Sequence, residues 1–182
     1  MSIEYKDVKL RAIEESDLEL LLEMMNDSEI QKMVVGSGAP VSMYQQKKWF
    51  ESLQTNKNEL RLMIETKEHG TIGLITLTSI DYINRKAEFS YKIASSKNIR
   101  GSGYGTKAYI AIINYAFYQL NLNCINSENL EYNTVTEHIK KKLGFIKEGI
   151  LRERVFRNGK YHNTHIWSLL KKDWEEVQKS IQ

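Results

Sequence analysis

A short run, Arg100-Gly101-Ser102-Gly103-Tyr104-Gly105, holds the residues of this 182-residue chain that are best suited to binding chemistry. Glycines let backbone N–H groups approach a ligand with no Cβ in the way, and an adjoining helix N-terminus attracts an anion. The run follows a stretch typical of a strand and precedes one typical of a helix. Arg100 can add a charge-assisted contact, and Thr106 follows in the first turn of the helix. Residues 100–106 therefore predict a site for a phosphate or diphosphate group.

Other phosphate-binding loops fit these residues less well. A Walker A loop requires Gly-Lys-Ser/Thr, which Gly105-Thr106-Lys107 does not supply. A dinucleotide-binding Gly-x-Gly-x-x-Gly loop needs a third glycine where Thr106 or Ala108 stands. The variant with alanine in the third place does fit, but that loop usually follows the first strand of its unit, not the middle of the chain. A plain turn made of glycines stays an alternative.

Composition limits the remaining classes of protein. Hydrophobic residues make up 41% and charged residues 27% of the chain, which suits a packed core and a charged surface. The net charge of +3 is spread too evenly for a nucleic-acid partner to be expected, so an RNA- or ribosome-associated protein ranks lowest. No run approaches the roughly 18 apolar residues of a membrane span or forms a signal peptide. Because Cys124 is the single cysteine, no internal disulfide can form, and we expect a cytoplasmic location.

The elements that must position the glycine-rich run can be read from apolar periodicity and turn residues. Strands are expected at 8–13, 60–66, 71–80, 87–94, 122–129, 145–156 and 160–170. Helices are expected at 17–26, from Ser42, at 106–120 and at 134–143, with terminal helical turns at 173–179. Capping boxes at Ser16–Glu19 and Ser42–Gln45 mark two of the helix starts. The pattern predicts one α/β domain over residues 1–182, a mixed (α+β) sheet with helices on both faces in the order β-α-α-β-β-β-α-β-α-β-β.

Two motifs resemble the GNAT superfamily of N-acetyltransferases. Arg100, Gly103 and Gly105 match its Arg/Gln-x-x-Gly-x-Gly/Ala acetyl-CoA signature between a strand and a helix. Asn133, followed by Lys142-Leu143-Gly144-Phe145, resembles its Asn-x(n)-Lys-x-Gly-Phe segment. The resemblance covers nearly the whole chain and points to the branch that includes ribosomal-protein alanine, spermidine and nucleotide-amino-sugar N-acetyltransferases. The branch-specific residues are Leu10-Arg11, Asp17-Leu18, Glu148-Gly149, Leu151-Arg152 and Asn158-Gly159-Lys160-Tyr161.

The resemblance implies a GNAT fold and acetyl-CoA as the co-substrate, with direct transfer of the acetyl group to a primary amine and no metal. The strand before the loop should splay from its neighbour and leave a slot for the pantetheine arm. Free N–H groups near Ile93 and Ala94 would polarise the thioester carbonyl as an oxyanion hole does. The residues expected to bind the cofactor are Ile93, Ala94, Arg100, Gly101, Ser102, Gly103, Tyr104, Gly105, Thr106, Asn133 and Lys142.

The catalytic residues depart from the family pattern at one place. Many relatives carry a tyrosine that protonates the leaving thiolate, and Lys140 stands at that position here. Asn133 and Thr136 are assigned instead to the pantetheine amide or the departing sulfur, and Tyr132 is a possible substitute acid. Glu88 is the expected general base, and it would need desolvation or an ordered water to take a proton from an ammonium. A salt bridge from Glu88 to Arg85 or Lys86 is the competing interpretation.

The acceptor amine, a small molecule or a peptide, is expected to bind between residues 24–49 and the Asn158 hairpin. Met25-Asn26-Asp27-Ser28 and the segment around Trp49 are similar to nucleotide-amino-sugar acetyltransferases, which makes such a sugar the first expectation. A ribosomal-protein N-terminus or a polyamine is the alternative acceptor. A CoA-binding module without catalysis is the alternative of another class, and a homodimer is left open.

Overall fold

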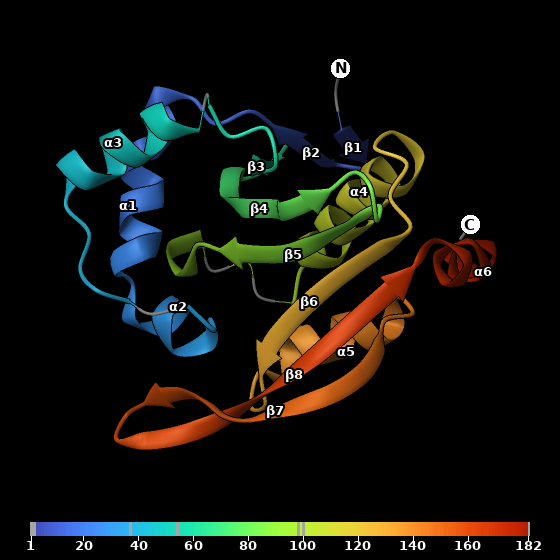
Figure 1. The fold of residues 1–182 in the computed structure, drawn as a ribbon. Helices are drawn as coiled ribbons and strands as arrows, with labels where there is room; N and C mark the ends of the chain where they lie inside the picture. The colour runs from blue at the N-terminus through green and yellow to red at the C-terminus, as the bar shows by residue number, and fades with distance from the viewer. Residues whose placement is uncertain (1–2, 37, 54, 98, 100, 182) are drawn as a thin grey trace.

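The computed structural model describes residues 3–36, 38–53, 55–97, 99 and 101–181. Arg100, which the sequence places in the glycine-rich loop, lies outside the described residues. The strands are β1 (Ile3–Tyr5), β2 (Val8–Arg11), β3 (Leu60–Thr66), β4 (Gly70–Asp81), β5 (Lys86–Ile93), β6 (Cys124–Leu130), β7 (Ile146–Arg157) and β8 (Lys160–Leu170). The helices are α1 (Leu18–Asn26), α2 (Ser28–Met33), α3 (Met43–Ser52), α4 (Tyr104–Tyr118), α5 (Thr134–Lys142) and α6 (Lys171–Ile181), with 3-10 turns η1 (Glu15–Asp17) and η2 (Ser95–Lys97) (Figure 1).

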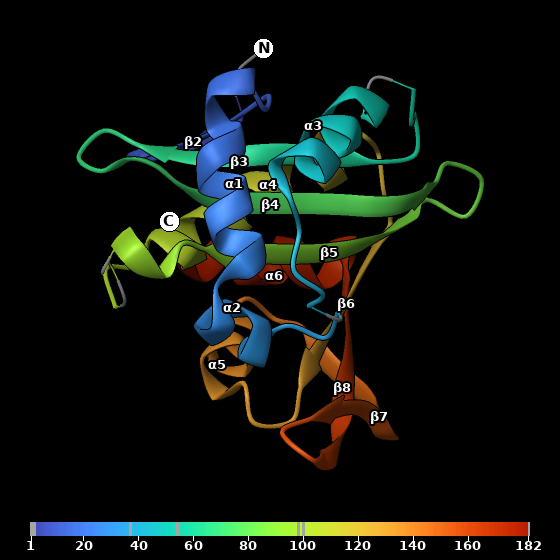
Figure 2. The same cartoon turned by 90° about the vertical axis from the view of Figure 1, so that its left-hand side faces the viewer.

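The strands form one mixed sheet in the order β1-β2-β3-β4-β5-β6-β8-β7. Among the described strands, β5 and β6 are the one parallel pair. Their pairing runs only from Lys86–Cys124 to Glu88–Asn126. Beyond those pairs the two strands diverge, β5 along the upper strands and β6 away from them (Figure 2).

Helices cover both faces of the sheet, as the sequence predicts. Figure 2 shows α1 and α3 in front of β3, β4 and β5, and α4 behind them. In Figure 1, α5 lies behind β8. Helix α4 is apolar on most of its surface, with Ala108, Tyr109, Ile112 and Ile113 fully buried, so it forms the centre of the largest hydrophobic core. Its N-terminus is thereby held at the end of the sheet toward which the splayed part of β5 runs.

The structure corrects the expected order of elements in three places. The short strand β1 and the six-residue helix α2 were not expected, and α6 is an 11-residue helix rather than a turn or two. Helix α2 forms because Asp27 caps it, with its side chain accepting from the N–H groups of Glu29 and Ile30. Helix α6 is anchored by the buried Trp174, whose Nε1 donates to Asn114 Oδ1 at 2.9 Å.

One predicted helix cap is confirmed and one is wrong. Ser42 and Gln45 form the expected capping box at α3. The box near α1 joins Glu14 and Asp17 instead of Ser16 and Glu19. Asp17 is fixed there because Arg11 donates to both of its oxygens, at 2.7 and 2.8 Å. The Asn158-Gly159 turn between β7 and β8 has positive φ angles of 50° and 77°, as its hairpin signal predicts.

Candidate active site

The gap between β5 and β6 exposes backbone groups of β5 that have no strand beside them. Ala94 N–H donates to Ile72 O at 2.9 Å, so it points toward β4. Phe89 O points the other way, because Ser127 Oγ of β6 donates to it at 3.1 Å. Since backbone groups alternate in direction along a strand, the N–H groups of Tyr91 and Ile93 face the gap. The N–H group of Ile93 can therefore still polarise the thioester carbonyl, as expected. The expectation of a free N–H group is wrong for Ala94, because that group already has a partner.

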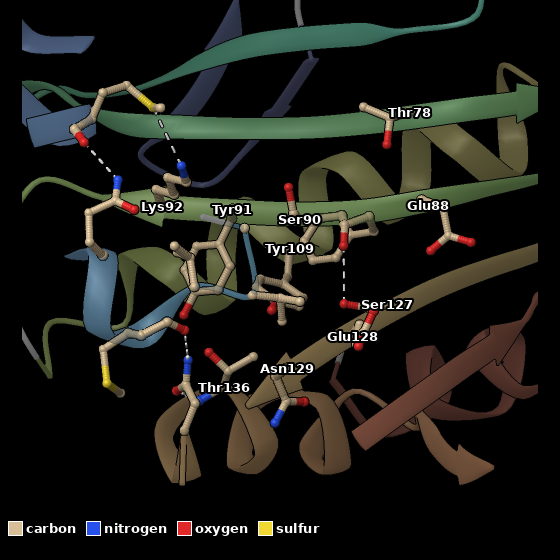
Figure 3. A pocket seen from close by; sticks show the side chains of 18 residues that line it. Thr78, Glu88, Ser90, Tyr91, Lys92, Tyr109, Ser127, Glu128, Asn129 and Thr136 are labelled. Atoms are coloured by element: carbon tan, nitrogen blue, oxygen red, sulfur yellow. Dashed lines mark hydrogen bonds between the residues drawn. The ribbon is translucent and has the colours of Figure 1, made fainter. Parts of the chain in front are cut away.

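A cavity of about 390 Å³ lies at this gap. Figure 3 shows β5 above it, with β6 and α5 below, and side chains from all three elements directed toward it. Part of its wall comes from the chain around α2. The lining residues are Met25, Gln31, Met33, Val34, Val35, Gly36, Thr78, Glu88, Phe89, Ser90, Tyr91, Lys92, Tyr109, Ser127, Glu128, Asn129, Asn133 and Thr136.

The side chains of β5 alternate between two helical layers. Lys92 faces α1, where its Nζ lies 3.6 Å from Met25 Sδ. Phe89 and Tyr91 face α4, and their ring centroids lie 4.4 and 4.8 Å from that of Tyr109. A ligand in the gap can therefore be approached from the α1 side by one set of groups and from the α4 side by another.

Glu88 stands where the paired part of β5 and β6 ends. It is exposed, lines the cavity, and lies opposite Thr78 of β4 and Asn126 of β6. Within the described part of the chain its carboxylate forms no ion pair, so the alternative salt bridge to Arg85 or Lys86 is not formed. The cavity contains a second carboxylate, Glu128 of β6, which accepts a hydrogen bond from Thr164 Oγ1.

Two phenols in the cavity, Tyr91 and Tyr109, were not among the residues expected from the sequence. Figure 3 shows the Tyr91 hydroxyl directed toward Thr136 of α5. Burial raises the pKa of both phenols above the usual value. Strand alternation places Tyr91 on the α4 side of β5, but only the divergence of β6 makes it a cavity residue.

The glycine-rich loop has the geometry of an anion site. Gly101 and Gly103 adopt φ angles of +83° and +81°, and a Cβ on either would meet nothing within 4 Å. The first helical bond of α4 runs from Lys107 N–H to Gly103 O, so the N–H groups of Gly105 and Thr106 have no intrahelical partner. Open space beside unpaired N–H groups at a helix start fits a diphosphate.

Other residues predicted to bind the cofactor form contacts within the protein or lie away from the loop. Ser102 N–H closes a turn by donating to Ile99 O at 3.2 Å. The Tyr104 side chain is buried, and its hydroxyl donates to Glu68 at 3.0 Å, so its side chain anchors the loop. Lys142 is exposed in the last turn of α5. A cofactor contact from Lys142 stays a prediction.

A segment of the cavity wall, residues 32–36, is held by three donors that are distant in sequence; we call it the strap. The Tyr132 hydroxyl donates to Lys32 O at 2.6 Å, and Asn133 Nδ2 donates to Met33 O at 3.1 Å. Arg157 of the β7–β8 hairpin donates to Gly36 O. Asn133 also caps α5, since its Oδ1 accepts from Thr136 N–H at 3.2 Å. Asn133 therefore joins the strap to the helix, and the Tyr132 hydroxyl is occupied by the strap.

Lys140 is fully buried on the inner side of α5, one turn after Thr136. Its Nζ donates to Asn129 Oδ1 at 2.9 Å and lies 5.7 Å from the Trp167 ring centroid. Burial lowers the pKa of Lys140 to about 7, against the opposing effect of the Glu128 and Glu137 carboxylates. Lys140 does not line the cavity but supports Asn129, which does.

Two of the histidines lie beside carboxylates. His162 and His165 lie 3.5 and 3.3 Å from Glu131 and Glu137. Within residues 3–181, apart from the gaps stated above, no group of three or more His, Cys, Asp and Glu side chains is arranged to hold a metal ion. No helix in the described part is long and apolar enough to cross a membrane.

Known proteins resemble this chain in sequence and in structure. Residues 7–146 match the family described as acetyltransferase (GNAT) domain. The chain is 30% identical over 155 residues to the spermidine N(1)-acetyltransferase of Vibrio cholerae, which covers 85% of this chain and 87% of that one. The crystal structure of the V. cholerae spermidine N-acetyltransferase in complex with CoA and spermine superposes with a TM-score of 0.86 at 27% identity, covering 93% of this chain and 98% of that chain.

A third relative is YdaF, a candidate ribosomal N-acetyltransferase of Bacillus subtilis (strain 168). It is 38% identical over 103 residues, which are 57% of this chain. The match spans about half of YdaF, 55% of its length.

Proposed function

The chain belongs to the acetyltransferase (GNAT) domain family, and from this premise we propose which amine it acetylates and which residues carry the transfer. It is an acetyl-CoA-dependent N-acetyltransferase. The proposed acceptor is a small polyamine that enters from the α1 side of the gap. None of the relatives described above is named for an amino sugar, so the nucleotide-amino-sugar acceptor is not carried forward.

Two carboxylates support a polycationic acceptor. Glu88 and Glu128 both line the cavity, from strands that diverge from a common point. Opposite charge within the same cavity attracts a ligand with several ammonium groups. Lys92 lies four residues further along β5, about 13 Å from Glu88 by strand rise, so it limits the cationic part of the ligand to the Glu88 end. The spermidine acetyltransferases among the relatives agree with this class of acceptor.

The N-terminal amine of a protein is the second candidate acceptor. The similarity to YdaF favours it, because YdaF is named for ribosomal acetylation and shares 38% identity over the matched segment. A peptide would enter from the same side of the gap.

The proposed roles follow from the divergence of β6 after the Glu88–Asn126 pair, the observation that carries this assignment. Acetyl-CoA supplies the thioester carbonyl carbon that the amine attacks. The N–H groups of Gly105 and Thr106 hold the diphosphate, and those of Tyr91 and Ile93 receive the carbonyl oxygen as negative charge develops on it. Glu88 accepts the proton of the attacking amine, directly or through one water.

A comparison of acceptors tests this proposal. Acetyl transfer from acetyl-CoA is measured with spermidine, spermine, peptide N-termini and amino sugars, for wild type, Glu88→Gln and Glu148→Gln. Burial, and after it the charges of Glu148 and Glu88, raise the pKa of the Cys124 thiol. Glu148 therefore lies near the same thiol as Glu88 yet does not line the cavity, which makes it the matched control. We expect the highest kcat/KM with a polyamine, and a kcat lower by about 10- to 100-fold in Glu88→Gln alone, with a changed pH profile.

Three other results would contradict parts of this proposal. A preference for peptide N-termini would replace the polyamine by the second candidate. Equal activity of Glu88→Gln and Glu148→Gln would remove Glu88 as the base, and no transfer to any amine would overturn the proposed function.

A further inference from the structure

The departing sulfur needs a proton, and the position where many relatives carry an acid cannot supply it here. Lys140 is held by Asn129 and does not line the cavity. The Tyr132 hydroxyl is occupied by Lys32 O in the strap. Thr136 lines the cavity, but an aliphatic hydroxyl is a much weaker acid than a phenol. We infer, building on the proposed function, that Tyr91 is the catalytic acid that protonates the sulfur when the acetyl group leaves.

The Tyr91 ring lies beside the glycine-rich loop. A Cβ built on Gly105 would lie 3.5 Å from Tyr91 Cε2 and 3.8 Å from Ile139 Cδ1. Gly105 is in the first turn of α4, where the N–H groups face the proposed diphosphate site. An arm that runs from that site into the gap therefore passes the Tyr91 ring before it reaches the N–H groups of Tyr91 and Ile93.

The surroundings of Tyr91 keep its hydroxyl protonated and oriented. The Tyr109 ring packs against it at 4.8 Å with an interplanar angle of 76°, which fixes the ring from behind. The Tyr91 hydroxyl is directed toward Thr136 of α5 (Figure 3). Because burial raises the pKa of the Tyr91 phenol, its hydroxyl keeps its proton at neutral pH and gives it up only as the carbon–sulfur bond breaks.

Alternation along β5 separates the base from the acid. Glu88 belongs to the side of the strand that faces α1, and Tyr91 to the side that faces α4. Three residues of strand place them about 10 Å apart along β5. The amine can lose its proton on one side of the gap while the sulfur gains one on the other.

The proton and electron balance is simple. The amine nitrogen forms a bond to the carbonyl carbon, and the carbon–sulfur bond breaks with its electron pair on sulfur. Tyr91 gives its hydroxyl proton to that sulfur, so a thiol leaves and a phenolate remains. The phenolate regains a proton from solvent, and Glu88 holds the proton of the amine.

The test uses Tyr91→Phe, which keeps the ring and removes only the hydroxyl, with Tyr161→Phe in the exposed hairpin as the matched control. Calorimetry compares CoA with desulfo-CoA, which lacks the sulfur. We expect wild type and Tyr161→Phe to bind CoA about three- to tenfold more tightly than desulfo-CoA, and Tyr91→Phe to lose this difference. We also expect Tyr91→Phe to lower kcat by about 10- to 100-fold and leave the KM of the amine within about twofold.

An unchanged kcat in Tyr91→Phe, or an unchanged preference for CoA over desulfo-CoA, would overturn the inference. Thermal unfolding of the variant checks that its fold is intact. If wild type transfers no acetyl group, the proposed function fails, and the calorimetry still decides whether Tyr91 contacts the sulfur.

Discussion

The glycine-rich loop and the wall of the cavity are built in opposite ways. The loop gathers its groups from neighbouring residues, since Gly101 to Thr106 supply both the open space and the unpaired N–H groups. The wall joins segments that are far apart, because Tyr132 and Asn133 bond residues 100 positions away and Arg157 bonds one 121 positions away. A local motif can be inherited intact, whereas a wall of distant parts can change whenever one part changes. This difference explains why the cofactor is easier to assign than the acceptor.

The first prediction tests the loop half of this comparison. Gly103→Val should lower the affinity for CoA by about 100-fold or more, because the side chain would fill open space needed by the ligand and would strain a backbone with φ of +81°. Calorimetry with CoA measures the change. Gly159→Val is the control, since Gly159 has φ of +77° and equally open space in the β7–β8 turn. Equal CoA affinity in both variants would move the diphosphate away from this loop.

The second prediction tests the support behind the cavity wall. The pKa of Lys140 is lowered from 10.5 to about 7 in the folded chain, so between these values the unfolded chain binds more protons. The free energy of unfolding of wild type should therefore rise by about 2 kcal/mol from pH 6 to pH 9 relative to Lys140→Met, and this gain is lost as the pH falls toward 7. Urea unfolding at both pH values measures it.

Lys147→Met is the control for this experiment, because Lys147 lies 5.8 Å from the same Trp167 ring and is exposed. Its stability should follow that of wild type at both pH values. Parallel pH dependence of wild type and Lys140→Met would show that Lys140 keeps an ordinary pKa.

The third prediction concerns the strap and has the smallest effect. Tyr132→Phe removes the hydrogen bond to Lys32 O, which is worth about 1 kcal/mol, so the KM of the amine should rise about fivefold while that of acetyl-CoA stays unchanged. Steady-state kinetics measures both constants. Tyr82→Phe is the matched control, since its hydroxyl bonds Lys57 O at 3.5 Å and Tyr82 does not line the cavity. If the KM of acetyl-CoA changes instead, the strap contacts acetyl-CoA rather than the amine, and the prediction is wrong.

Much of the fold could be predicted because its signals are local. The bounds of β3 and β8 agree with the strands expected at 60–66 and 160–170, and the Ser42–Gln45 box starts α3. The start of α1 could not be decided from the sequence. Two overlapping capping boxes compete there, and Arg11 of β2 selects Asp17. Helix α2 was missed because its six residues show too little apolar periodicity to predict a helix.

The candidate site, like the fold, could be predicted only where its residues are close together in the sequence. Its glycines and Glu88 could be found from their types and spacing, since a loop and a strand face are local properties. Tyr91 could not, because its access to the cavity depends on where β6 leaves β5. The strap could not either, because a backbone carbonyl such as Lys32 O carries no sequence signal and its partner lies 100 residues away.

The short contact between β5 and β6 has a mechanical consequence. The sheet has two parts, strands β1 to β5 and strands β6, β8 and β7. Three register pairs join these parts, and all three lie at one end of the contact between β5 and β6. Directly after the last of these pairs, the Ser127–Phe89 hydrogen bond adds one more link between the two parts of the sheet. A ligand that binds between β5 and β6 beyond these links touches both parts of the sheet at once and therefore adds to the few contacts that join the two strands.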